Sequence, residues 1–164
     1  MIPGLFRASL PVAPYAASLE TGIPPPDPRQ LAARTRQLAL GAGVLLVEGA
    51  GGLLVPLSAT DSMADFALAL GLPLLLVAQD QLGVLSSVLT CAESAARHRL
   101  VLAAVVLVDR GVIDADPSPR TNRRILAQRL AVPVLAFPRC PDDDDALADA
   151  AERCGLLALV PPPA

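Results

Sequence analysis

The chain has 164 residues, 53% of them hydrophobic but only 2% aromatic, and its formal net charge is −3. A chain of this length buries roughly 70% of its unfolded surface, so we expect one domain over residues 1–160 and a proline-rich tail over residues 161–164. The acidic balance argues against nucleic acid as a partner, and the apolar stretches are too short to cross a membrane. Three cysteines without CxxC spacing and a single histidine make no zinc site. With no secretory leader, we expect a cytoplasmic protein.

Four short apolar runs predict β-strands that are covered on both faces, as in a parallel sheet. In chain order these runs are residues 44–47, 74–77, 102–108 and 132–136. Segments with helical periodicity lie before and between the strands and after the last of them. In chain order these segments are residues 29–40, 64–70, 84–97, 122–130 and 146–153. The alternation predicts an α/β fold with a doubly wound, mostly parallel sheet and helices on both faces.

Two boundary signals accompany these elements. Gly71 follows the second predicted helix and is a natural C-terminal stop. The acidic run over residues 142–145 precedes the last predicted helix, where the helix dipole favours carboxylates, so we interpret it as a solvated N-terminal cap.

The segment over residues 44–52 carries the first candidate site. An apolar run leads directly into Glu48, and three of the next four residues are glycine. Ligands of open α/β sheets bind at the carboxyl ends of strands, and carboxylate oxygens suit Mg²⁺, so we predict Glu48 as a metal ligand. The glycines allow close backbone approach and offer amide groups to an anion. The structural alternative is a strand end followed by a flexible turn.

A second candidate site lies over residues 82–86, where a predicted strand passes into a helix. Free amide groups at a helix N-terminus form an anion pocket. The structural alternative is a glycine turn capped by Ser86 or Ser87, and both interpretations can hold together.

These segments resemble dethiobiotin synthetase. The similarity includes the motif VEGAGGLLVPL, the stretch LPLLLVAQDQLG at residues 72–83, Thr121 with Asn122, and Phe137 with Pro138. Residues 11–17 are similar to the family's Pro-x-Ser-Pro-His segment.

The resemblance implies a P-loop type ATP- and Mg²⁺-dependent cyclo-ligase that joins CO₂ to 7,8-diaminopelargonate and acts as a homodimer. Glu48 would then bind Mg²⁺, and the opposite subunit's substrate would place its carboxylate against Gly83, Val84, Leu85 and Ser86. Substrate and phosphate would lie against Pro14, Gly49, Ala50, Gly51 and Gly52. The nucleotide base would lie near Val108, Asp109 and Pro138.

The sequence departs from the family in several places. It contains neither a GxxxxGKS/T phosphate loop nor any lysine. Val108 stands at the position of the family's adenine-reading Asn, Ser86 at that of an Asn, and Tyr15 at that of a His. We therefore expect the chain to form the C-terminal two-thirds of the family fold, without the P-loop strand. We expect these 164 residues alone to be inactive. A start codon assigned too far downstream is the favoured reason, ahead of a partner polypeptide that completes the sheet or a repacked chain.

Two other functions stay open. One is a non-catalytic carboxylate-binding or regulatory module derived from the same family, consistent with the missing phosphate loop. The other is a fragment similar to cobyric acid synthase, which shares VEGAG, although residues 82–90 resemble dethiobiotin synthetase more closely.

Overall fold

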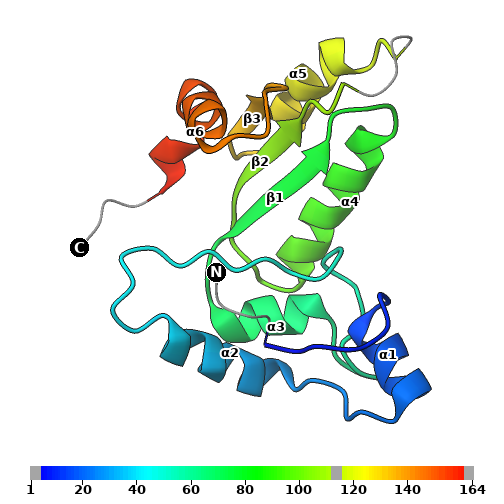
Figure 1. Cartoon of the computed structure of the whole chain (residues 1–164). Coiled ribbons are helices and arrows are strands. Elements are labelled where there is room, and N and C mark those ends of the chain that lie inside the picture. The colour runs from blue at the N-terminus through cyan, green and yellow to red at the C-terminus, as the bar shows by residue number, and fades with distance from the viewer. Residues whose placement is uncertain (1–4, 112–115, 161–164) are drawn as a thin grey trace. The chain divides into compact units, whose positions relative to one another are not determined.

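The computed structural model describes residues 5–111 and 116–160, and these form two compact units (Figure 1). The first unit comprises Met1–Leu72 with Arg97–Leu100, and the second comprises Pro73–Ala96 with Val101–Ala164, each as far as it is described. The proline-rich tail predicted over residues 161–164 lies outside the described residues.

The first unit consists of three helices with long connections. Its helices are α1 (Pro14–Thr21), α2 (Pro28–Leu38) and α3 (Met63–Leu70). A small core of Ala32, Leu57, Phe66 and Leu70 joins α2 to α3. The Arg36 guanidinium strengthens this pairing, because it donates to the backbone carbonyls of Ala69 and Leu70 at the end of α3.

Local signals explain where these helices begin and end. The Asp27 carboxylate accepts a hydrogen bond from Arg29 N at 2.7 Å, and Pro28 occupies the first helical position of α2. As predicted, α3 ends at Gly71, which takes a left-handed φ of 72°. Helix α1 was not predicted, because eight residues show little amphipathic pattern. Its signals, a proline at the start and a left-handed glycine at Gly22, were present in the sequence.

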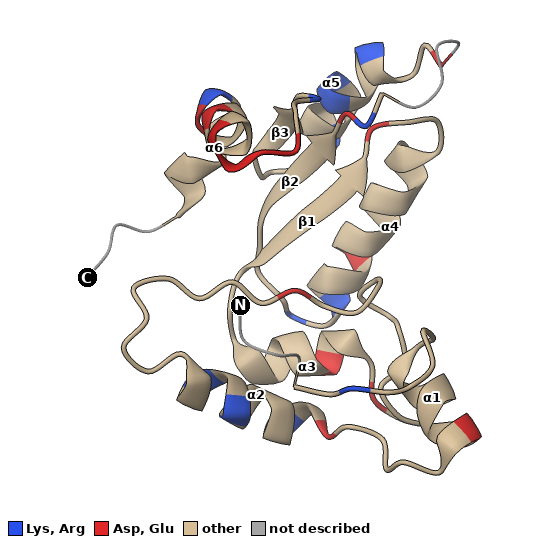
Figure 2. Cartoon of the chain, viewed as in Figure 1, with Lys and Arg blue, Asp and Glu red and all other residues tan. Residues whose placement is uncertain are grey.

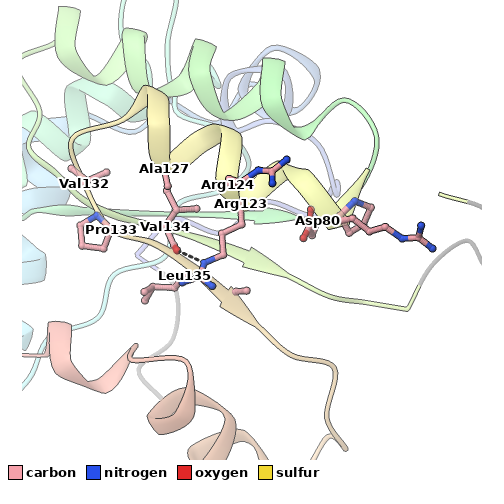
Figure 3. Close-up of a pocket in the computed structure, with 11 residues that line it drawn as sticks. Asp80, Arg123, Arg124, Ala127, Val132, Pro133, Val134 and Leu135 are labelled. Carbon is pink, nitrogen blue, oxygen red and sulfur yellow. Dashed lines mark hydrogen bonds between the residues drawn. The ribbon is translucent and has the colours of Figure 1, made fainter. Parts of the chain in front are cut away.

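The second unit is a three-stranded parallel sheet with helices on both faces. Its elements are β1 (Leu74–Gln79), α4 (Val84–Arg97, of which Arg97 belongs to the first unit), β2 (Leu102–Val108), α5 (Pro119–Arg129), β3 (Val134–Phe137), α6 (Asp144–Arg153) and a short 3₁₀ turn (Leu157–Leu159). The strand order is β1-β2-β3, and both pairings are parallel. Helices α4 and α5 lie on one face and α6 on the other (Figures 1 and 3). The predicted α/β class and mostly parallel sheet are confirmed.

The core of the second unit lies between the sheet and the α4–α5 layer. Its buried members are Val84, Val88, Val105, Leu107, Leu126 and Val134. The predicted N-terminal cap of α6 is confirmed, since Asp143 accepts a hydrogen bond from Ala146 N at 2.9 Å.

The strand predicted over residues 44–47 is wrong, because the structure has no strand there. A β-strand needs a neighbour that accepts and donates its backbone hydrogen bonds, and none of the described residues pairs with this segment. Leu46 is 85% exposed and Val44 is 45% exposed, while Val47 packs in part against the core of the first unit.

Candidate functional site

The loop between β1 and α4 contains the first part of the site. Residues 80–83, called the strand-end loop below, follow the carboxyl end of β1, where ligands of open α/β sheets bind. Gly83 takes a φ of +94°, which side-chain-bearing residues rarely adopt, and this turn directs the chain into α4. Val84 is buried in the core, and its amide donates to Gln81 O at 3.1 Å. The first turn of α4 is thereby fixed at its start.

The predicted anion corner at residues 83–86 is brought together by this turn. Among the described residues, the amides of Leu85 and Ser86 have no acceptor and are therefore available to an anion. The serine cap, which was the structural alternative, is not formed among the described residues. Ser86 is exposed, and the Ser87 hydroxyl donates to Gly83 O at 3.3 Å instead of accepting from an amide.

Side chains of α5 and of the segment preceding it fix the strand-end loop. The buried Asn122 amide donates from Nδ2 to Asp80 Oδ1 at 2.8 Å and reaches Gln81 O at 3.4 Å. The Asp116 carboxylate accepts from Leu82 N at 2.7 Å and from Ser118 N at 2.9 Å. Hydrogen bonds from the Ser118 hydroxyl and amide, and then from Leu82 N, lower the pKa of Asp116, so its carboxylate is charged at neutral pH.

Sequence reasoning assigned no role to Asn122 beyond its place in the family pattern, and none to Asp80 or Asp116. Asn122 and Asp80 are 42 positions apart, and no local pattern connects them. The sequence signal that could have identified Asn122 was its place as a polar residue near the start of a helix, on the face that the helix buries.

A third group lies at the carboxyl ends of β2 and β3. Val108 pairs with Phe137, which is followed by Pro138, so these residues lie at neighbouring strand ends. Asp109 N donates to Phe137 O at 3.0 Å, and the exposed Asp109 carboxylate accepts from Gly111 N at 2.8 Å. Val108 offers no polar side-chain atom to a base edge, and the Asp109 carboxylate already accepts a hydrogen bond within its own turn.

The residues predicted for metal and phosphate lie in the first unit. Glu48 is exposed in an irregular segment and does not stand at the tip of a strand. Gly51 has a φ of +77°, and a Cβ there would lie 3.0 Å from the Val55 side chain, while a Cβ on Gly49 would lie 3.1 Å from Met63. The left-handed backbone favours glycine at Gly51, whereas the only close contact at Gly49 is with the end of the flexible Met63 side chain. Ala50 and Gly52 are exposed beside them.

Pro14 is buried at the first position of α1, and the next amide, Tyr15 N, donates to Pro56 O at 3.3 Å. In the structure, Pro14 therefore serves to start α1. Within the described ranges, no three metal-binding side chains gather in one place. Glu48 offers a single exposed carboxylate, which fits a Mg²⁺ ion held mainly by phosphate oxygens and water.

The second unit also contains a groove of about 650 Å³ between α5 and β3 (Figure 3). The Arg123 Nε donates to Val134 O at 2.9 Å, which covers part of the exposed edge of β3. Arg120, Arg124 and Asp80 also line the groove. Figure 2 shows basic positions, in blue, along α5 and acidic positions, in red, around the start of α6. The groove was not anticipated, because it depends on a helix and a strand meeting in space.

In the part of the chain that the structure covers, no helix is both long enough and apolar enough to cross a bilayer.

Comparison with known proteins gives consistent results. The model of a protein family described as an AAA domain matches residues 15–143. An ATP-dependent dethiobiotin synthetase BioD of Anaeromyxobacter dehalogenans is 40% identical over 84% of this chain and 61% of its own length. The protein of the same description from Saccharopolyspora erythraea is 37% identical over 93% of this chain and 68% of its own length. The protein of the same description from Aromatoleum aromaticum is 36% identical over 81% of this chain and 60% of its own length. The chain thus spans about three fifths of the length of the first of these relatives.

Proposed function

Because the chain belongs to the dethiobiotin synthetase family and has a mostly parallel α/β fold of the P-loop type, we propose that it serves ATP-dependent ring closure on a diaminopelargonate-like substrate. The observation that carries this proposal is the corner at residues 83–86. There a left-handed glycine and a buried valine begin α4, and the amides of Leu85 and Ser86 have no acceptor among the described residues. Amide groups at a helix N-terminus bind carboxylates, and the substrate of such a ligase ends in one.

We assign the remaining roles by the same family membership. Glu48 contributes one carboxylate to Mg²⁺, which neutralises phosphate charge when it is bound. Residues 49–52 and Pro14 border the substrate, and the strand ends at Val108, Asp109 and Pro138 border the nucleotide. The protein acts as a homodimer in the cytoplasm, with the carboxylate corner receiving substrate from the opposite subunit.

The phosphate-binding part of the reaction is not supplied by these 164 residues, which contain no GxxxxGKS/T loop and no lysine. Since ATP phosphates need such donors, we propose that this chain alone binds the substrate carboxylate but does not close the ring. ATP-dependent ring closure by the purified chain, abolished by Glu48→Gln, would contradict this.

Isothermal titration calorimetry tests the binding proposal directly. We expect 7,8-diaminopelargonate to bind, and 7,8-diaminononane, which keeps both amines but lacks the carboxylate, to bind at least about tenfold more weakly. Equal affinity for the two ligands would show that residues 83–86 do not bind the carboxylate.

A second candidate function is a non-catalytic carboxylate-binding module. Val108 favours it, because valine cannot pair with an adenine edge. Fusing the phosphate-loop unit of a relative to these 164 residues and titrating with Mg²⁺ and ATP separates the two functions. The module then still binds diaminopelargonate but no ATP at millimolar concentration, whereas the ligase binds both.

A further inference from the structure

The strand-end loop, residues 80–83, is fixed by hydrogen bonds from a distant part of the chain. Asp80 N continues the sheet by donating to Val108 O at 2.9 Å. Its side chain is fixed separately, because Asn122 Nδ2 donates to Asp80 Oδ1 at 2.8 Å. The same Asn122 nitrogen lies 3.4 Å from Gln81 O and from Ser118 Oγ. One side chain therefore contacts two consecutive loop residues.

Because the Asn122 side chain is buried, its hydrogen bonds matter more than those of a surface residue. The residue is only 2% exposed, and a buried amide without partners is costly, so the bond to Asp80 is strongly preferred. A carboxylate acceptor also makes this hydrogen bond stronger than one between neutral groups. Aspartate at position 122 could not replace it, because a carboxylate has no N–H donor and would repel Asp80.

Asp116 holds the next residue of the loop. Leu82 is 80% exposed, so its side chain adds little packing that would hold the backbone in place. Leu82 N instead donates to Asp116 Oδ2 at 2.7 Å, while Asp116 Oδ1 accepts from Ser118 N at 2.9 Å. Asn122 and Asp116 together fix the three residues that precede Gly83.

The direction of the free amides depends on this loop. Gly83 has no side chain and takes a φ of +94°, so its own conformation is not restricted by packing. We infer that Asn122 and Asp116 are positioning residues, which hold residues 80–82 so that the amides of Leu85 and Ser86 meet the substrate carboxylate in one orientation. The carboxylate-binding half of this inference rests on the proposed function, whereas the half that concerns the loop does not.

The test uses the 164-residue chain and two readouts. The variants are Asn122→Ala, Asn122→Asp and the reciprocal exchange that combines Asp80→Asn with Asn122→Asp. Amide hydrogen exchange measured by NMR at Leu82 and Val84, whose amides are hydrogen-bonded, reports the order of the strand-end loop, and calorimetry reports the affinity for 7,8-diaminopelargonate. We expect each single variant to speed exchange in the loop and raise Kd about tenfold. The reciprocal exchange restores one amide–carboxylate bond, so it should recover both values.

Gln128→Ala is the matched control, since it removes an exposed amide side chain from the same helix. It should change neither readout. The inference is overturned if Asn122→Ala leaves loop exchange at the wild-type rate. It is also overturned if exchange rises equally in β2, which would indicate general destabilisation, or if the reciprocal exchange rescues nothing.

Failure of the proposed function gives a different result. If wild-type protein binds diaminopelargonate no better than diaminononane, the carboxylate corner is rejected. The exchange rates of Leu82 and Val84 then still decide whether Asn122 positions the loop, because that readout needs no ligand. Asp116→Asn provides a second variant of similar shape, and it should speed exchange at Leu82 most.

Discussion

At Gly83 the backbone takes a conformation that places most side chains in conflict with their own carbonyl groups, although space around the residue is open. The cost of a side chain here is therefore local strain and not a collision with neighbours. Because this residue joins the strand-end loop to α4, strain at Gly83 should alter how the first amides of α4 are directed.

We predict that Gly83→Ala lowers the free energy of unfolding by about 1–2 kcal/mol and raises Kd for 7,8-diaminopelargonate about tenfold. Urea denaturation and calorimetry measure the two effects. Gly155→Ala is the control, because Gly155 is also left-handed, at φ 82°, with open space around it in the same unit. It should show a similar loss of stability without a change in Kd.

Helix α3 shows how a terminal carboxylate stabilises an element. Asp65 Oδ2 accepts from Ser62 N at 2.7 Å and from Ser62 Oγ at 2.8 Å. The backbone and then the hydroxyl hydrogen bond of Ser62 lower the pKa of Asp65, despite a small opposing effect of burial. A lowered folded pKa means that this contribution to stability is complete above the unfolded pKa and is lost as the pH falls through the folded value.

We predict that Asp65→Asn reduces the free energy of unfolding by about 1 kcal/mol at neutral pH, and that the difference from wild type shrinks below about pH 4. Urea denaturation over a pH series measures this. Asp142→Asn, which changes an exposed carboxylate, should leave the pH profile unchanged. A constant difference at all pH values would show that the effect of Asp65 is not electrostatic.

The elements of the second unit were predicted closely. The bounds of α4 and β2 agree with the sequence pattern, while α5 begins three residues earlier because Pro119 starts the helix. Residues 44–47 have the same apolar composition and form no strand. Periodicity reports whether a segment can be buried in a sheet, but strand formation also requires a hydrogen-bonding neighbour.

For the molecule as a whole, stability depends on a small aliphatic core. Leu126 of α5 is fully buried against side chains of β2 and β3. We predict that Leu126→Ala costs about 2–5 kcal/mol, through lost transfer free energy and the cavity left behind. Leu82→Ala, at a residue 80% exposed, should cost less than about 0.5 kcal/mol. Chemical denaturation compares the two, and equal losses would mean that this core does not hold the second unit together.

The sequence by itself determined the α/β class, most helices and strands of the second unit and the family, because these depend on local periodicity and on motifs that are contiguous in the chain. It also located the glycine turn before α4. Only the tertiary structure decided that Asn122 and Asp116 reach the strand-end loop and that α5 and β3 enclose a groove. It also decided that residues 44–47 have no strand partner among the described residues. Each of these depends on which distant segments meet, and one-dimensional periodicity carries no information about that.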